Sequence, residues 1–486
     1  MSRALAIDLG ASSGRVTVAT FDDGQVQLEE IHRFANNPVR ANGTLYWDIL
    51  SILHEIKTGI AKATADGEVD TIGIDSWGVS FALIDEYGRM VDMPVHYRDD
   101  RTDDWLQLFE RIPKEEIYAI TGIQNMQINT IFQLDYLARK RPKDIESAKA
   151  FLMIPDLLNY FLTGEKNNEY TIASTTQLMD AKTRSWSKQL IDRIGMDPTV
   201  FGNITMPGTI SGVLTGMICE ETRSKPVNVY CIASHDTASA VAAIPAPGKS
   251  DYMYISSGTW SLVGTELDEP LLSKAALIHN FTNEGGAQGR IRFLKNVMGS
   301  FLVQETRKQW AREGKDYSFV DLDGMGEAAP HVGSYIDVDD TLFIKEGNIP
   351  ERIASFCNKT DQRVPQTEGE IMRVIYESLA LKYRYIAEKM AECTDKKVHA
   401  IHIIGGGSQS DTLCRMTANA TGLPVFAGPS EATTIGNAIV QWIASGELKS
   451  IDEGRQVIKD AFPQREYLPQ GNMESSYEKF LHILST

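Results

Sequence analysis

The sequence predicts an α/β protein built from two related domains. Apolar, β-branched stretches alternate with stretches in which apolar residues recur at helical spacing. The chain has 486 residues, which exceeds the usual size of a single hydrophobic core. The strand–turn–strand pattern of residues 4–21 occurs again at residues 252–267. This repeat predicts two related domains of the same architecture that face each other.

The elements of the first half follow from their apolar patterns. Residues 4–10 and 16–21 predict two strands around a short turn, and residues 69–85 predict two more. Residues 48–65 have apolar side chains at helical spacing and predict a helix. The stretch from Arg98 to Trp186 is mostly helical in pattern and predicts an insertion beside the sheet.

The second half starts after a strand that runs into a helix at residues 227–244. The Pro/Gly segment from Pro245 to Asp251 is the expected boundary, which gives domains 1–244 and 251–486. Residues 293–310 predict a helix, and residues 398–428 predict strand, glycine turn, helix and strand. A last helix is expected at residues 432–445.

Composition and charge exclude several classes of protein. A formal net charge of -17 argues against nucleic acid as a general partner. No uncharged apolar run approaches the roughly 18–20 residues that span a bilayer, and the start of the chain does not resemble a signal peptide. The five cysteines form no C-x-x-C pair, so we expect free thiols in a cytoplasmic protein, with a Cys219–Cys231 disulfide as the alternative. No motif for a tightly held structural metal is present.

The two small turns are the first candidate site. The turn Gly10–Gly14 and the turn Ser256–Thr259 are rich in Gly, Ser and Ala, so their backbone N–H groups are free to point at an anion. Arg15 adds a charged fork of donors, and Asp8 at a strand end is expected to act through Mg²⁺. Each turn alone is typical of an ordinary β-hairpin, but the pair predicts phosphate binding.

Asp236 is the second candidate. It lies between a strand and a helix, where ligands of α/β sheets bind, and an acid there accepts the proton of an attacking hydroxyl. The alternative is that Asp236 only caps the helix. His235 is a rival base or a positioning group, and Thr237 is a helix N-terminal donor or a ligand contact.

Other stretches offer weaker interpretations. The turn Gly405–Gly407 suits close approach by a nucleotide base or is a plain strand-to-helix turn. Asn296, Ser300 and Gln304 are spaced by four and would share one face of the predicted helix, either toward a cleft or solvated. Trp77 beside Gly78 suits a sugar ring or a core position, and the charged run Tyr97–Thr102 suits a polyol or is solvated.

In this order, these motifs resemble the FGGY family of carbohydrate kinases over nearly the whole chain. The stretches that carry the resemblance are DLGASSGR, SSGTW, FLTGEKNNEYTIASTTQLMDAKTRSW and HIIGGGSQSDTLCRMTANATGLPV. The resemblance implies two domains of the actin/hexokinase-like (ribonuclease H-like) ATPase fold with a cleft between them. It also implies ATP and Mg²⁺ as cofactors, a ketose as the substrate and no membrane partner. A monomer or a homodimer is expected.

Within the family, the stretches GIDSWGV, YRDDRT, ASHDTASAV, TNEGGAQGR and LKNVMG are most similar to members that phosphorylate L-rhamnulose on its 1-hydroxyl during L-rhamnose degradation. Asp236 would then be the catalytic base, and Gly78, His235, Asp236 and Thr237 would touch the sugar. The implied ATP contacts are Ala11, Ser12, Ser13, Gly14, Arg15, Thr259, Asn296, Gln304, Gly405, Gly406 and Gly407.

One departure from the family pattern concerns the sugar. Ser80 stands where the pattern WGVDF has an acid, which leaves the preferred ketose open, with L-fuculose or xylulose as alternatives. A different class is also open, namely a nucleotide-dependent sensor of the same fold that transfers nothing. Asp236 discriminates between the two classes, because a binding module needs no base.

Overall fold

The computed structural model describes residues 1–248 and 251–485, and these form two compact units. Unit 1 comprises Met1–Gly248, Glu266–Phe293 and Ala432–Ala461, and unit 2 is the rest of the described chain, mainly Leu294–Glu431. The units are therefore not contiguous halves, because two segments of the second half belong to unit 1. Within the expected boundary at Pro245–Asp251, Lys249 and Ser250 lie outside the described residues.

A six-stranded sheet forms the centre of unit 1. Its strand order is β13-β14-β6-β1-β2-β3. The bounds are β1 (Ser2–Leu9), β2 (Ser13–Asp22), β3 (Gln25–Ala35), β6 (Thr71–Ser76), β13 (Thr209–Val213) and β14 (Asn228–Cys231). The first three strands form an antiparallel meander, and β6 pairs in parallel with both β1 and β14. The predicted strands at residues 4–21 and the first strand of residues 69–85 are confirmed.

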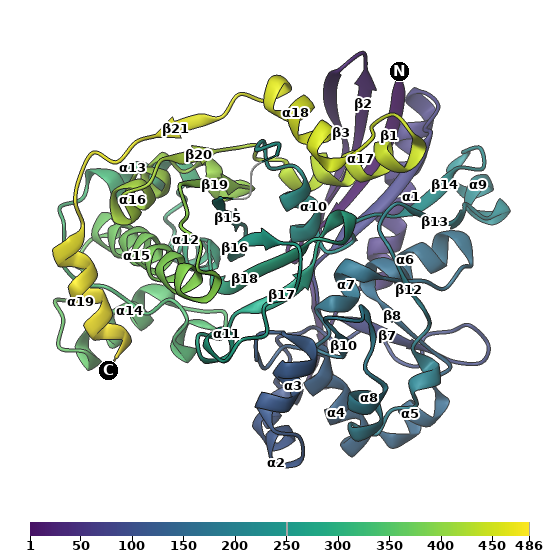
Figure 1. Ribbon diagram of the computed structural model, residues 1–486, viewed down its shortest axis with the longest axis horizontal. Coiled ribbons are helices and arrows are strands. Elements are labelled where there is room, and N and C mark those ends of the chain that lie inside the picture. Colours follow the sequence, from purple (N-terminus) through teal and green to yellow (C-terminus); the bar gives the residue numbers. More distant parts are fainter. Residues whose placement is uncertain (249–250, 486) are drawn as a thin grey trace. The chain divides into compact units, whose positions relative to one another are not determined.

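Helices cover this sheet because its central strands β1 and β6 are buried on both faces. Successive side chains of β1 point to opposite faces, so Leu5, Ile7 and Leu9 join a core with α1 (Ile49–Asp66), the predicted helix. On the other face, α17 (Ala432–Ser445) lies against β1 and β6 and packs closely on α10 (Asp236–Ala242). Figure 1 shows α17 beside the N-terminal strands although more than 400 residues separate them in sequence.

A mostly helical region follows β7 (Phe81–Ile84), as predicted. Its own core is separate from that of the sheet and includes Phe132, Phe151 and Leu190. The helices are α2 (Leu108–Arg111), α3 (Lys114–Thr121), α4 (Thr130–Lys140), α5 (Pro142–Ser147), α6 (Ile154–Thr163), α7 (Tyr170–Ser174) and α8 (Lys188–Arg193). The strand β8 (Ala150–Met153) pairs with β7 in a separate two-stranded sheet.

The second large sheet has seven strands in the order β17-β18-β16-β15-β19-β20-β21. They are β15 (Tyr252–Ser257), β16 (Trp260–Leu267), β17 (Thr282–Gly285), β18 (Ile291–Met298), β19 (Ala400–Ile404), β20 (Val425–Ala427) and β21 (Arg465–Tyr467). The hairpin β15–β16 with β19 parallel to β15 repeats the arrangement of β1–β2 with β6. The repeat predicted between the two halves is thus a repeat of strand topology.

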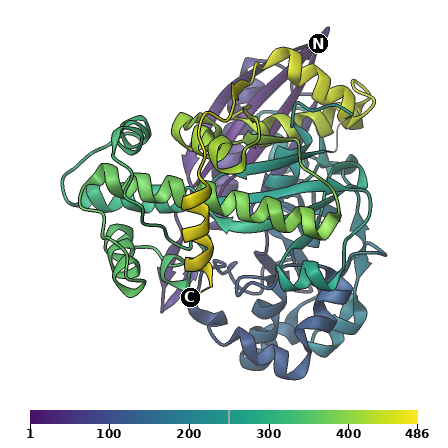
Figure 2. The same cartoon turned by 60° about the vertical axis from the view of Figure 1, so that its left-hand side comes forward.

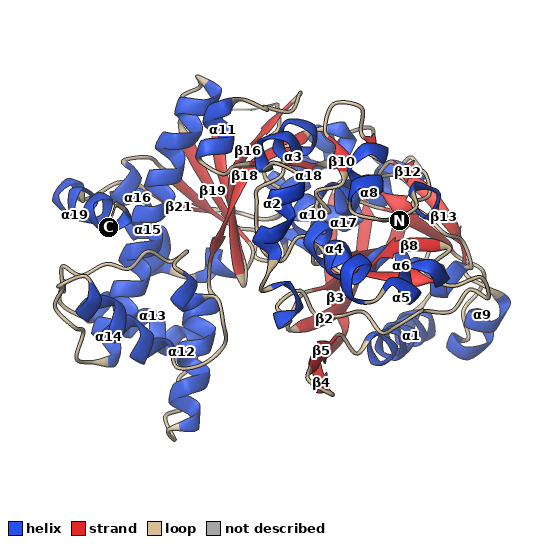
Figure 3. Ribbon diagram, turned by 90° about the horizontal axis from the view of Figure 1, so that it is seen from below, coloured by secondary structure: helices blue, strands red, loops and turns tan. Residues whose placement is uncertain are grey.

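The helices of unit 2 gather around a long central one. The helix α15 (Glu368–Thr394) contacts α13 (Phe319–Ala328), α16 (Asp411–Thr421) and α19 (Glu474–Leu484). Figure 2 shows the yellow helix α19 crossing the green α15. Figure 3 shows α12 (Phe301–Arg312), α13 and α14 (Ile349–Lys359) grouped together.

One predicted helix is wrong in its first half. Residues 293–298 belong to β18, and the helix α12 begins only at Phe301. The run Ile291–Met298 has no regular apolar–polar alternation, but it is held in the sheet between β16 and β17, so sheet pairing overrides the helical spacing. Asn296 therefore does not share a helix face with Ser300 and Gln304.

The cysteines and the helices settle two other points. All five cysteines are free, so the alternative disulfide between Cys219 and Cys231 is not formed. Among the described helices, none has the length and apolar character that crossing a membrane requires.

Candidate active site

Three strand ends of unit 1 meet at one edge of its sheet. In the parallel pairing of β1 with β6, Asp8 is the partner of Asp75, and Leu9 is the partner of Ser76. Beyond β14 the pairing continues, because the Ser76 N–H donates to the Ser234 carbonyl over 2.9 Å and Ser76 forms a bridge with His235. Asp8, Asp75 and the segment 234–237 therefore lie at the carboxyl ends of neighbouring strands, where α/β sheets bind ligands.

The carboxylate of Asp236 is held by one of its two oxygens. Thr237 donates to Oδ1 from its N–H over 2.5 Å and from its Oγ1 over 3.1 Å, and His235 Nε2 lies 3.5 Å from the same oxygen. The Asp236 side chain keeps 31% of its surface exposed. Among the described residues, every polar partner of this carboxylate is on Oδ1, so Oδ2 is left for a ligand.

Burial raises the pKa of Asp236 above its ordinary value. The neighbouring charge of Asp8 raises this pKa as well, whereas His235 and the hydrogen bonds from Thr237 lower it. Asp236 is also the first residue of α10 and not its N-cap; His235 takes the N-cap position without a capping hydrogen bond. The capping alternative for Asp236 is thus wrong, and the carboxylate is available for chemistry.

Two buried acids behind this segment are absent from the sequence prediction. Glu169 accepts the Ser234 N–H over 3.2 Å and the Thr171 Oγ1–H over 2.6 Å, and Thr171 Oγ1 in turn accepts the His235 N–H over 3.1 Å. Burial raises the pKa of Glu169 to about 7. Asp156 accepts the Glu169 N–H over 3.2 Å, and burial raises its pKa well above the ordinary value. These acids fix the backbone that leads into Asp236, and the stretch NEYTIAS gave no local sign of it.

Asp75 is a third buried acid that sequence reasoning missed. Its Oδ2 accepts the side-chain amide of Asn437 over 2.6 Å, and its Oδ1 has no hydrogen-bond partner among the described residues. Burial and the nearby charge of Asp8 raise the pKa of Asp75 well above its ordinary value. Gln441 completes the chain by donating to Asn437 Oδ1 over 2.7 Å. The signal that could have found Asp75 was its position at a strand end beside β1.

The first small turn is a tight hairpin loop between β1 and β2. The Gly10 N–H donates to the Ser13 carbonyl over 2.9 Å, and Ser12 at the tip is exposed. Arg15 Nη2 donates to Asp8 Oδ2 over 2.6 Å, and Thr434 Oγ1 lies 3.4 Å from the same oxygen. The structure thus brings together Asp8 and Arg15, which the sequence treated as separate contributors.

The second small turn lies in unit 2 beside the glycine turn. Gly258 is exposed at the tip between β15 and β16, and its N–H donates to the Trp260 carbonyl over 2.9 Å. A Cβ on Gly407 would overlap the Ser257 side chain, and one on Gly405 would lie 3.1 Å from the Ser257 carbonyl oxygen. Glycine is therefore required where the turn Gly405–Gly407 packs on Ser257.

The start of α12 is anchored to the same hairpin. Ser300 Oγ donates to the Gly258 carbonyl over 2.6 Å, and the Phe301 N–H donates to the Thr259 carbonyl over 3.1 Å. Gln304 donates from its amide to Ser300 Oγ over 3.1 Å. Thr259, Gln304 and the glycine turn are thus in one neighbourhood of unit 2.

Gly78 lies in a strained turn of unit 1. The Ser80 N–H donates to the Gly78 carbonyl over 2.8 Å, which makes a three-residue γ-turn, and Val79 at its centre has a φ of 62°. A positive φ is a genuine outlier for a β-branched residue. The Val79 N–H donates to Thr175 Oγ1 over 3.1 Å, and the Val79 carbonyl accepts from Thr130 Oγ1 over 2.8 Å and Gln133 Nε2 over 3.0 Å.

Substitutions of Val79 are expected to reveal this strain. Because only glycine adopts a positive φ freely, Val79→Gly should unfold at the same temperature as Val79→Ala or at a higher one. The usual order is the reverse, since glycine in place of alanine costs about 0.5–1 kcal/mol. Thermal unfolding of the two variants, compared with Val18→Ala and Val18→Gly in the buried strand β2, measures the difference. A Val79→Gly protein less stable than Val79→Ala would contradict the strain.

The residues around this turn are buried and pack in the core of unit 1. Ser80 is buried and its Oγ accepts the Trp47 Nε1–H over 3.1 Å. The rings of Trp77 and Trp47 lie 4.0 Å apart within the sheet core, which is the core alternative for Trp77. Ser80 is thus a packed, hydrogen-bonded residue, and its position is not an empty space left by the acid of the family pattern.

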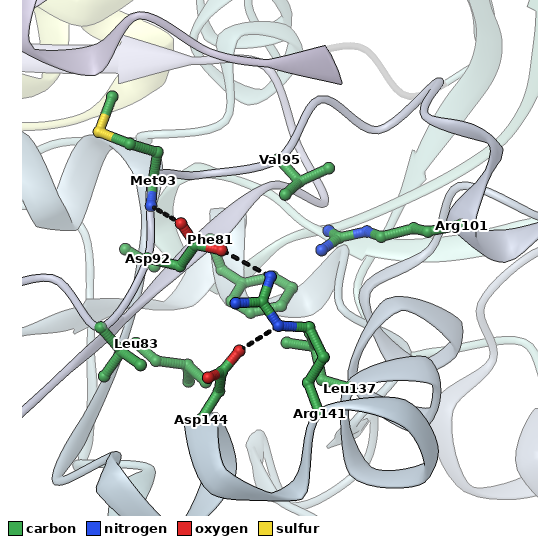
Figure 4. Close-up of a pocket in the computed structure, with 11 residues that line it drawn as sticks. Phe81, Leu83, Asp92, Met93, Val95, Arg101, Leu137, Arg141 and Asp144 are labelled. Atoms are coloured by element: carbon green, nitrogen blue, oxygen red, sulfur yellow. Dashed lines mark hydrogen bonds and ion pairs between the residues drawn. The ribbon is translucent and has the colours of Figure 1, made fainter. Parts of the chain in front are cut away.

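The charged run Tyr97–Thr102 is also engaged inside the protein. Arg101 Nη2 donates to Gln133 Oε1 over 2.5 Å, and Asp99 accepts the Leu45 N–H over 2.7 Å. Arg101 also reaches a small cavity of about 30 Å³, drawn in Figure 4. Arg141 also lines this cavity and pairs with Asp92 over 2.7 Å and with Asp144 over 2.5 Å. This space is the size of about one water molecule and does not hold a sugar.

Comparison with known proteins identifies the family. The chain matches the N-terminal domain of the FGGY family of carbohydrate kinases over residues 3–243 and the C-terminal domain over residues 253–445. The rhamnulokinase of Bacteroides thetaiotaomicron is 41% identical over 467 residues, which are 96% of this chain and 95% of the relative. The rhamnulokinase of Oceanobacillus iheyensis is 43% identical over 460 residues, which are 94% of this chain and 96% of the relative.

Solved structures agree on the fold. The ligand-bound xylulose kinase from Lactobacillus acidophilus matches with a TM-score of 0.79 and 16% identity, covering 100% of this chain and 96% of that one. The glycerol kinase of Plasmodium falciparum with ADP matches with a TM-score of 0.77 and 14% identity, covering 100% and 97%. With the two sheet-containing units, these matches confirm the actin/hexokinase-like fold. The chain therefore belongs to the FGGY family of carbohydrate kinases and is a sugar kinase.

Proposed function

We propose that this sugar kinase transfers the γ-phosphoryl group of ATP to the 1-hydroxyl of L-rhamnulose, with Asp236 as the general base. The observation that carries the proposal is the Asp236 carboxylate at the carboxyl end of β14, which keeps Oδ2 clear while Oδ1 accepts from Thr237. Relatives 41–43% identical over nearly the whole chain are named rhamnulokinase, which supports the choice of ketose.

In the proposed phosphoryl transfer, the two oxygens of Asp236 have different roles. As the 1-oxygen of the sugar attacks the γ-phosphorus in line, Oδ2 takes its proton, the new P–O bond forms and the bond to the leaving ADP oxygen breaks. A raised pKa makes Asp236 a stronger base than an exposed aspartate, and the bonds from Thr237 keep its orientation fixed. Gly78, His235 and Thr237 are proposed to contact the sugar.

ATP contacts are proposed in each unit. In unit 1 they are the turn residues Ala11, Ser12, Ser13 and Gly14 with Arg15, whose guanidinium supplies positive charge for phosphate oxygens. In unit 2 they are Thr259, Asn296, Gln304 and the turn Gly405–Gly407. Glycine at 405 and 407 is enforced by the Ser257 contact, and the same lack of side chains admits a flat base.

Asp8 fits the Mg²⁺ that accompanies ATP in this family. Mg²⁺ keeps several waters and takes one or two carboxylates together with substrate phosphates, so the single carboxylate of Asp8 at the end of β1 suits it. The proximity of the acidic charges of Asp8 and Asp236 also favours a cation there. When bound, Mg²⁺ neutralises charge on the phosphates.

The same proposal covers the setting of the enzyme. We place it in the cytoplasm, in L-rhamnose degradation, as a monomer or homodimer that acts on small molecules and not on nucleic acid. The net charge of -17 supports the last point. By sequence, residues 1–244 form its sugar-binding domain and residues 251–486 its adenosine-binding domain.

A coupled assay of ADP formation tests the proposed reaction. With L-rhamnulose, L-fuculose and D-xylulose offered separately, kcat/KM should be largest for L-rhamnulose, and ADP formation without a sugar should be slow. A larger kcat/KM for another ketose would replace the substrate but keep the reaction. If none of a broad set of ketoses accelerated ADP formation, the sensor of the same fold would be the better account.

A further inference from the structure

A buried arginine lies behind His235, on the side opposite the Asp236 carboxylate. Arg292 on β18 has an exposed fraction of 0%, and its Nη2 lies 2.8 Å from His235 Nδ1. The same Nη2 donates to Glu284 Oε2 over 3.0 Å, and Nε donates to the Gly285 carbonyl over 2.8 Å. All these residues belong to unit 1.

The chemistry of these groups determines which ring nitrogen carries the proton. A guanidinium has only donors and stays protonated in proteins, so the nitrogen 2.8 Å from it must be an acceptor. A neutral imidazole that accepts at Nδ1 carries its proton on Nε2. Glu284 Oε2 is also 3.3 Å from Nδ1 and would favour a proton there, but its charge is paired with Arg292.

We propose that Arg292 is a positioning residue that holds His235 as the neutral Nε2–H tautomer. Within the described part of the chain, the charged groups that face the ring are Asp236, Glu284 and Arg292. With Nε2 as the donor, His235 points its proton at Asp236 Oδ1, 3.5 Å away, and at any sugar oxygen beside it.

This inference rests on the proposed role of Asp236, but its first test does not depend on activity. Two-dimensional ¹⁵N–¹H NMR reads the tautomer of each imidazole, and the chain has only nine histidines. The His235 signals are assigned by their loss in His235→Asn. We expect the Nε2–H form at neutral pH in the wild type. An Nδ1–H or imidazolium ring there would overturn the proposal.

Variants separate positioning from folding. Arg292→Met with Glu284→Gln removes both buried charges, and Arg292→Lys retains a cationic donor. Arg290→Met is the matched control, because its ion pair with Asp268 lies at the surface. In the double variant we expect the Nε2–H tautomer to be lost and kcat to fall roughly tenfold to a hundredfold with KM for ATP unchanged. The single variant Arg292→Lys should keep the Nε2–H tautomer and much of the wild-type kcat.

The outcomes are distinct. A double variant that folds, as shown by its thermal transition, and keeps both the Nε2–H tautomer and wild-type kcat would overturn the role of Arg292. If the double variant does not fold, Arg292→Lys and the wild-type spectrum still decide the tautomer. If Asp236→Asn retains full activity, the proposed base is wrong, while the spectrum still reports on Arg292 and His235.

Discussion

Replacing Asp236 by asparagine is expected to lower kcat by roughly 10²–10⁴-fold, the usual contribution of a general base. Asparagine keeps the size of the side chain and an oxygen that accepts from Thr237, so the start of α10 is preserved. It cannot take the proton from a sugar hydroxyl. KM for ATP should change little, and steady-state assays with L-rhamnulose measure both constants.

The dependence on pH gives the second signature of Asp236. A base must be ionised to act, and burial raises the pKa of this carboxyl above its ordinary value. As pH falls through that raised pKa, kcat/KM for the sugar should fall, and the residual activity of Asp236→Asn should lack this acid limb. Asp316→Asn, which removes a carboxylate that is 91% exposed, is the control. An unchanged kcat, or an acid limb that persists in Asp236→Asn, would assign the base elsewhere.

Local patterns predicted the parts of the fold that depend on local residues. The hairpin β1–β2, the helix α1 and the turn Gly405–Gly407 follow from apolar spacing and from glycine at strand ends. The helix predicted across Asn296 is wrong because β18 pairs with two neighbouring strands. The spacing of apolar residues within the segment does not indicate that pairing.

Sequence analysis predicted those candidate site residues whose chemistry is indicated by a single short motif. Asp8 stands out because it lies near the end of β1, and Asp236 because it begins α10 shortly after β14, each next to small or polar residues. Asn437, which donates to Asp75, is 362 residues away from it in sequence, and Arg292 is 57 residues from His235. These partners belong to ordinary-looking helices and strands. Only the packing of distant segments brings them together, so no local pattern could indicate them.

The largest expected effect on stability is at Gly436, where α17 crosses α10. A Cβ at this position would overlap the backbone carbonyl of Ser239 on α10. A backbone atom cannot move aside by a change of rotamer, so Gly436→Ala should destabilise unit 1 by about 3 kcal/mol, the upper part of the range for overpacking. The gain in helix propensity from alanine, about 1 kcal/mol, does not offset this. The unfolding temperature should fall by several degrees.

A glycine in an open helix position provides the matched comparison. Gly324 in the helix α13 has no atom within 4 Å of an added Cβ, so Gly324→Ala should raise stability by up to about 1 kcal/mol. Gly436→Ala should also lower kcat, because the displaced helix α10 carries Asp236 at its first position. Thermal unfolding and steady-state assays of the two variants measure both effects. If Gly436→Ala unfolded at or above the wild-type temperature, the close crossing of α10 and α17 would not be what places Asp236, and the contacts of Glu169 and Thr171 with the segment before it would have to do so alone.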